Sequence, residues 1–158
     1  MNTWATSQRV DNRGINIDRL RASLQERGYS STHITAALQK LLAAADVSGI
    51  QPYEANQRTY QLLRYGIPVQ VAAGKALETV AERNHFALAE EVRLKGAGDN
   101  TRRPDIVLYI NGIAMVVLEL KSASVEVGEA IRQLISNQDP LFHPGFFSTV
   151  QLLLAGND

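Results

Sequence analysis

PDIVLYINGIAMVVLELK, which occupies residues 104–121, contains two apolar runs separated by Asn111-Gly112. Asn-Gly between apolar runs is a strong β-hairpin signal, because both residues tolerate the positive φ angles that a two-residue turn requires. The runs at 104–110 and 113–121 are therefore predicted to form adjacent antiparallel strands.

Three ionisable residues stand in this apolar stretch: Asp105, Glu119 and Lys121. A buried charge without a partner costs free energy, so we expect these three side chains to interact with one another or with a common ligand. Two carboxylates can bind Mg²⁺ together with the carbonyl of Leu120, and such a site can direct water at a phosphodiester. Lys121 lies two residues after Glu119, so strand alternation places both side chains on one face, where the lysine would polarise the water.

The register of the hairpin decides whether the two carboxylates can share a cation. With a simple two-residue turn, Asp105 would face Leu118, and Glu119 would point to the opposite face of the sheet. A three-residue loop or a β-bulge shifts the pairing by one residue and returns both carboxylates to one face. Shared metal binding therefore predicts a bulge or an odd loop, and a two-residue turn without a bulge would exclude it.

Composition limits the class of protein. The chain has 158 residues, 45% hydrophobic and 20% charged, which suits a globular domain with a sizeable core. Sixteen basic residues balance sixteen acidic ones, so a nucleic acid would have to bind to a local patch. The absence of cysteine excludes disulfides and thiolate chemistry and suits the cytoplasm. No signal peptide or membrane-spanning run is apparent, so we expect a soluble cytoplasmic protein.

Helical patterns dominate the N-terminal part of the chain. Residues 1–14 are polar and are predicted to be an irregular lead-in. Capping residues and glycine stops then indicate three helices, of which the first two form a hairpin. Their expected ranges are 16–28, 30–46 and 52–66.

Alternating patterns follow residue 66 and indicate a sheet. Strands are predicted near 67–71, 86–94 and 149–154, and residues 75–84 fit a helix or a strand, with strand preferred. An amphipathic helix is predicted from Val127 to Pro140. The predicted class is α/β (α+β), a mixed sheet flanked by helices. We divide the chain into a helical portion at 1–50 and a domain at 51–158 that carries the ionisable residues.

These motifs resemble the PD-(D/E)xK nucleases, and most closely the N-terminal nuclease domain of the R (motor) subunit of type I restriction enzymes. The resemblance covers about residues 55–156 and is densest between residues 102 and 142. Within that part it rests on the stretches 102–107, 111–113, 117–121 and 129–134. It implies a restriction-endonuclease-like fold that uses Mg²⁺. It also implies that Asp105, Glu119 and Lys121 are catalytic and that Gln133 supports the site near the DNA.

The resemblance implies further partners. R subunits hydrolyse unmodified foreign double-stranded DNA after ATP-driven translocation, together with methyltransferase (M) and specificity (S) subunits. This sequence has no Walker-type phosphate loop, so ATP would be used by motor domains outside it, and we expect a piece of a longer protein. Many relatives carry a tyrosine four residues after the glutamine, where this chain has Asn137.

Several assignments remain open from the sequence. Arg102 and Arg103 are candidate phosphate contacts, or they solubilise a loop. Gln133 fits a solvated helix position equally well, and Glu54 and Glu78 are candidates for a further acidic ligand although each suits a solvated charge better. Two other functions fit: a stand-alone structure-selective nuclease of the same fold, and a non-cleaving DNA-binding or docking module.

Overall fold

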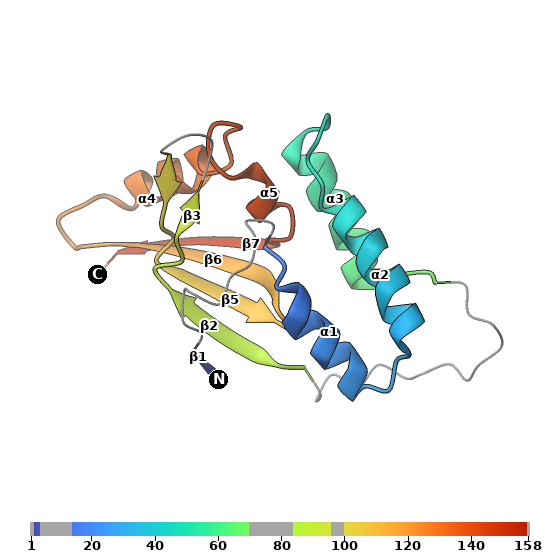
Figure 1. The fold of residues 1–158 in the computed structure, drawn as a ribbon. Helices are drawn as coiled ribbons and strands as arrows, with labels where there is room; N and C mark the ends of the chain where they lie inside the picture. Colours follow the sequence, from blue (N-terminus) through green and yellow to red (C-terminus); the bar gives the residue numbers. More distant parts are fainter. Residues whose placement is uncertain (1, 4–13, 70–83, 96–99, 158) are drawn as a thin grey trace.

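A mixed β-sheet lies beside three N-terminal helices in the computed structural model, which describes residues 2–3, 14–69, 84–95 and 100–157 (Figure 1). Within these residues the main sheet has five strands in the order β1-β2-β5-β6-β7, and β3 and β4 pair separately. The strands are β1 (Asn2–Thr3), β2 (Phe86–Glu90), β3 (Leu94–Lys95), β4 (Thr101–Arg102), β5 (Ile106–Ile110), β6 (Ile113–Lys121) and β7 (Leu152–Asn157). The predicted fold class, a mixed sheet with helices preceding it, is confirmed.

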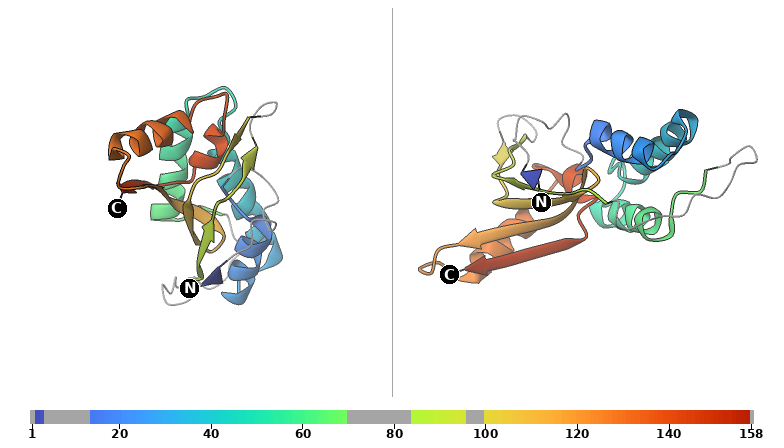
Figure 2. Two further views of the ribbon diagram at one scale, coloured as in Figure 1. Left: turned by 90° about the vertical axis from the view of Figure 1, so that its left-hand side faces the viewer. Right: turned by 90° about the horizontal axis from the view of Figure 1, so that it is seen from below.

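Strand directions follow the connections between them. The tight turn joins β5 to β6 in antiparallel fashion, and β2 pairs antiparallel with the other side of β5. β6 and β7 are parallel, which requires a crossover, and α4 (Val127–Ser136) supplies it. Figure 2 shows α4 running along β6 and β7, so residues of this helix lie over the C-terminal half of β6.

The N-terminal helices begin and end as their capping residues predict. Asn16 and Ser30 accept backbone hydrogen bonds from the first turns that follow them, and Gly66 ends the third helix at φ 87°.

Among the described residues, no helix is both long and apolar enough to span a membrane. The helices other than α4 are α1 (Ile17–Glu26), α2 (Ser31–Ala44), α3 (Pro52–Tyr65) and the short α5 (Pro144–Phe147).

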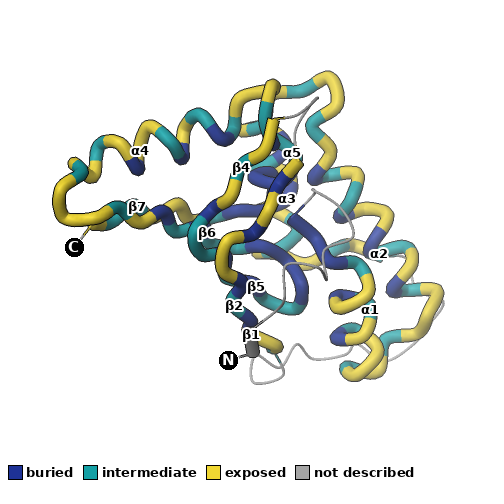
Figure 3. The backbone as a smooth tube through the Cα atoms, turned by 60° about the vertical axis from the view of Figure 1, so that its left-hand side comes forward, coloured by how far each residue is buried: buried dark blue, intermediate teal, exposed yellow. Residues whose placement is uncertain are grey.

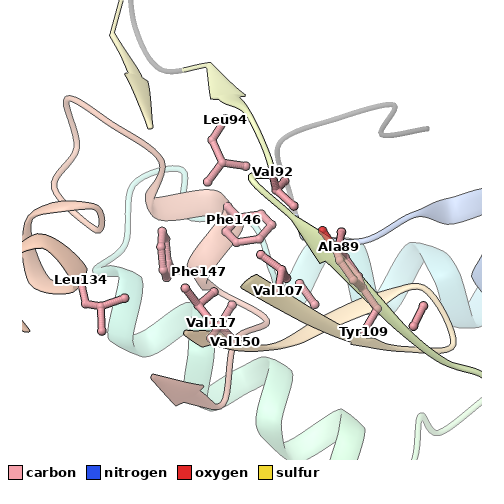
Figure 4. Packing of buried hydrophobic residues seen from close by; sticks show 12 residues of the cluster. Ala89, Val92, Leu94, Val107, Tyr109, Val117, Leu134, Phe146, Phe147 and Val150 are labelled. Atoms are coloured by element: carbon pink, nitrogen blue, oxygen red, sulfur yellow. The ribbon is translucent and has the colours of Figure 1, made fainter. Parts of the chain in front are cut away.

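Two hydrophobic clusters hold these elements together, and Figure 3 shows buried backbone concentrated in the central strands. One cluster packs α1 and α2 against Ile113 at the start of β6. The larger one fills the space between the sheet, α4 and α5, where Phe146 and Phe147 lie among Val107, Val117 and Val150 (Figure 4). α3 contacts both α2 and α5, and the division at residue 50 stays a prediction.

Several strand predictions outside the hairpin are wrong. Residues 67–69 form no strand, whereas residues 2–3, expected to be irregular, pair as β1 with β2. The remainder of the predicted strand at 67–71 and nearly all of 75–84 lie outside the described residues. Such short segments carry little periodicity, so pairing partners elsewhere in the chain decide their conformation.

The expected strand at 86–94 is interrupted. Glu91 has a φ of 49°, which ends β2 and changes which side chains face the core. Ala87 and Ala89 are buried before this break, and Val92 and Leu94 after it, so the core face moves from odd to even positions. The last strand begins at 152 rather than 149, because the residues before it pack beside α5.

Candidate functional site

The β5–β6 hairpin combines a two-residue turn with a β-bulge. Asn111 and Gly112 both have positive φ, and Ile110 pairs with Ile113 as the simple turn predicts. The register shifts after the pair Tyr109 and Ala114, because the next pair is Leu108 and Val116. Met115 is the additional residue, so the irregularity that shared metal binding requires is present as a bulge.

The bulge aligns the two carboxylates. Beyond it Ile106 pairs with Leu118, and continuation of this register places Asp105 opposite Glu119. Ala114 and Val117 both lie in the large core cluster although they are three positions apart, which strict alternation would not allow. Glu119 therefore continues the buried face of Val117.

Segments distant in sequence satisfy the backbone around the bulge. The amide of Ala114 donates to the carbonyl of Gly14, and the carbonyl of Ala114 accepts from the Thr149 hydroxyl at 2.9 Å. The carbonyl of Met115 accepts from the Gln151 amide at 2.9 Å. These contacts replace hydrogen bonds that a regular ladder would provide, so the bulge adds no unpaired backbone group at these positions.

Glu119 is a buried carboxylate, and only one of its two oxygens has a hydrogen-bond partner among the described residues. Its residue exposure is 1%, and its Oε1 accepts from the Lys121 ammonium at 2.9 Å. Its Oε2 is buried and has no hydrogen-bond partner in the described part of the chain. Burial raises the pKa of Glu119 above its ordinary value, repulsion from Asp105 adds to this, and the contact with Lys121 offsets only part.

Lys121 joins the strand to α4. Its ammonium donates to Glu119 Oε1 and also to Gln133 Oε1, at 2.7 Å. Because α4 packs over β6, Gln133 points to the sheet side of the helix and contacts the lysine rather than only solvent. The structure thus brings Glu119, Lys121 and Gln133 into one hydrogen-bonded chain.

The side chain of Asp105 contacts the C-terminal end of β6 through a backbone amide of that strand. Its Oδ2 accepts from the Leu120 amide at 2.7 Å. The N–H and C=O of one strand residue point to the same side, so the Leu120 carbonyl also faces β5. The three oxygen donors predicted from the sequence, from Asp105, Glu119 and Leu120, therefore come from adjacent strand positions.

This donor set suits Mg²⁺, which prefers oxygen ligands and keeps several of its waters. The Glu119 Oε2, which is buried and has no hydrogen-bond partner among the described residues, is the atom that a cation would satisfy. Within the described ranges, no group of three Asp, Glu, His or Cys residues is placed to hold a metal, so Glu54 does not join the pair. Glu54 instead lines a surface pocket on α3, and Glu78 lies outside the described residues.

The two arginines that precede Asp105 have different environments. The Arg102 guanidinium carbon lies 3.8 Å from the ring centroid of Phe142, whereas Arg103 forms an ion pair with Glu91 at 3.5 Å. Sequence reasoning missed Phe142, because no local pattern links it to Arg102.

Asn137 caps α4 and is fully buried, and its side-chain amide has no hydrogen-bond partner among the described residues.

Comparison with known proteins gives one family. A family model described as "Type I restriction enzyme R protein N terminus" matches residues 2–158. This match covers the N-terminal helices as well as the strands that carry Asp105 and Glu119. No curated protein and no solved structure gives a significant match.

Proposed function

Because the chain belongs to the family of type I restriction enzyme R protein N termini, we propose that it is a Mg²⁺-dependent endonuclease domain that cleaves double-stranded DNA. The bulge-aligned pair of Asp105 and Glu119, with Lys121 bonded to Glu119, carries this proposal. Family membership indicates the restriction system, and the arrangement of side chains favours phosphodiester hydrolysis.

Each residue has a role that follows from its contacts. Asp105, Glu119 and the Leu120 carbonyl would hold Mg²⁺. The bound ion would lower the pKa of a water molecule and neutralise phosphate charge. The Lys121 ammonium, fixed between two oxygen acceptors, adds positive charge where the phosphate becomes more negative during the reaction. Gln133 keeps this ammonium directed at the site.

The electrostatics of the metal-free site support cation binding. Continuation of the β5–β6 register places Asp105 opposite Glu119 at one strand end, and Lys121 supplies one compensating charge to Glu119. Burial raises the pKa of Glu119 above its ordinary value, and repulsion from Asp105 adds to the rise in spite of the contact with Lys121. A divalent cation would remove the remaining repulsion and would satisfy the unpartnered Oε2.

In the assembled enzyme, we propose that this domain cuts unmodified foreign DNA after ATP-driven translocation by motor domains. Methyltransferase and specificity subunits would be its partners, and recognition of the DNA sequence would belong to the specificity subunit. The 158 residues contain no Walker-type phosphate loop, so ATP hydrolysis would occur elsewhere. The domain itself would cut without reading a sequence, because its proposed catalytic groups act on the phosphodiester backbone.

Plasmid cleavage in the assembled enzyme tests this function. Lys121→Ala is expected to reduce Mg²⁺-dependent cleavage by about 10²-fold or more while ATP hydrolysis continues, because the lysine acts on charge that develops only at the cut. Lys40→Ala, at an exposed position in α2, is the matched control and should cut normally. Undiminished cleavage by Lys121→Ala would overturn the proposal and favour a non-cleaving DNA-binding module.

A further inference from the structure

An aromatic ring contacts the guanidinium of Arg102, which lies three residues before Asp105 in the sequence. Its guanidinium carbon lies 3.8 Å from the centroid of the Phe142 ring, which is within the range of a cation–π contact. The Arg102 Nε is buried and has no hydrogen-bond partner among the described residues, while the residue as a whole stays partly exposed. The ring therefore fixes the guanidinium, and no carboxylate within the described ranges forms an ion pair with it.

The loop that carries Phe142 is itself fixed. The Phe142 amide donates to the Asp139 carbonyl at 2.8 Å, and an Asp139 carboxylate oxygen accepts from the Leu141 amide at 2.9 Å. This loop follows α4, which supplies Gln133 to the site, and Arg102 lies three residues before Asp105. The stack thus joins the two chain segments that supply Gln133 and Asp105.

Arg103 provides an internal comparison, because it is the next residue and carries the same charge. Its guanidinium pairs with Glu91 at 3.5 Å, so an anion already accompanies it. Arg102 has a ring partner instead, which orients the guanidinium, and no carboxylate of the described residues compensates its charge. An ordered, uncompensated guanidinium is well suited to a phosphate, which it can bind through two N–H groups.

We propose that Arg102, and not Arg103, contacts a backbone phosphate of DNA bound at this site, and that Phe142 is the positioning residue for that contact. This inference rests on the proposed function, because it takes DNA to be the substrate. The contact is independent of DNA sequence, and it would orient the backbone as it approaches Asp105.

The salt dependence of DNA binding tests the contact. The affinity of the whole chain for a fluorescent DNA duplex is measured by anisotropy at several salt concentrations, with Ca²⁺ in place of Mg²⁺ to prevent cutting. Each lost phosphate contact lowers the slope of log affinity against log salt by about 0.9. Arg102→Ala is expected to show this decrease, whereas Arg103→Ala, which removes the same charge, should leave the slope unchanged.

Substitutions of Phe142 test the position of the Arg102 guanidinium separately from its charge. Phe142→Leu keeps Arg102 but removes the stack, so we expect weaker DNA binding than in the unmodified chain. Phe142→Tyr keeps an aromatic face and should restore the affinity. Thermal unfolding of each variant establishes that it is folded, and Arg102→Lys, which keeps the charge without the planar group, provides a milder second test with an intermediate affinity expected.

The outcomes distinguish this inference from the proposed function. Equal slopes for Arg102→Ala and the unmodified chain, or equal decreases for both arginine variants, would overturn the inference even if cleavage depends on Lys121. Binding of Phe142→Leu at full affinity would remove the positioning role of the ring. Cleavage that survives Lys121→Ala would overturn the proposed function and would leave the measured slopes intact.

Discussion

Glu119→Gln is expected to stabilise the metal-free fold and to abolish cleavage. Glu119 is 1% exposed, and burial together with Asp105 raises its pKa in spite of the contact with Lys121. A raised pKa means that folding favours the neutral side chain over the carboxylate. Glutamine is neutral, has nearly the same volume, and keeps an oxygen that can accept from Lys121.

The expected gain is about 1 kcal/mol. A buried, unsatisfied polar group costs about 1–3 kcal/mol, and the loss of attraction to Lys121 cancels part of what the substitution recovers. For a domain of this size, 1 kcal/mol corresponds to an increase of about 2–4 °C in Tm. Stability–function trade-offs of this kind are common where a site holds unfavourable charge.

The pH dependence follows from the direction of the shift. The stability that protonated Glu119 contributes is complete below the ordinary pKa of 4.5 and is lost as the pH rises through the raised pKa of the folded state. The difference between the variant and the unmodified chain should therefore be largest near neutral pH. It should disappear in acid, where Glu119 is already neutral.

Thermal and urea unfolding in the presence of a chelator, from about pH 4 to pH 8, measures this difference. Glu129→Gln is the control, because Arg132 lowers the pKa of the exposed Glu129 and its neutralisation should not stabilise the fold. Added Mg²⁺ should stabilise the unmodified chain more than Glu119→Gln, since only the former keeps both carboxylates. A Glu119→Gln chain that is less stable than the unmodified one at neutral pH without metal would refute the reasoning.

Two further substitutions and one deletion test the architecture of the hairpin that carries the site. Asp105→Asn should weaken Mg²⁺ binding about tenfold or more in a calorimetric titration, because a ligand charge is lost, and an unchanged affinity contradicts its role. Deletion of Met115 should remove the bulge and Mg²⁺ binding together, whereas Met115→Ala keeps the register and should bind normally. Gly112→Ala should cost about 1–3 kcal/mol in urea unfolding, because its φ is 89° and the new Cβ would lie 2.9 Å from the Asn16 carbonyl oxygen. Gly49→Ala, at a φ of 73°, should cost less, because apart from its chain neighbours no described residue lies within 4 Å of the new Cβ. Equal costs would argue against crowding.

Helix positions were predictable because their signals are local. Asn16 and Ser30 cap helices through bonds to residues three positions later, and Gly66 supplies a positive φ that few other residues adopt. The short α5 was not predicted, since four residues carry no recognisable period. The break after β2 was also missed, because alternation in the sequence gives no indication that Glu91 adopts a positive φ.

The sequence predicted the candidate site residues, but it did not predict their contacts. Charged residues at the ends of an apolar hairpin indicated Asp105, Glu119 and Lys121, and the structure places all three at one strand end. Gln133 was undecided between solvent and site until the packing of α4 on β6 placed it 2.7 Å from Lys121. The pairing of Arg102 with Phe142 depends on a loop whose course no local pattern encodes.

Local sequence was sufficient for the hairpin, its Asn111-Gly112 turn and the chemical nature of its charged ends, because turn geometry and strand alternation act over a few residues. The sequence showed that shared metal binding needs an irregularity in the register of the hairpin, but it did not distinguish a bulge from a longer loop. The bulge at Met115 depends on Gly14, Thr149 and Gln151, which reach β6 only when the chain is folded. Tertiary hydrogen bonding therefore places Glu119 on the same face as Asp105.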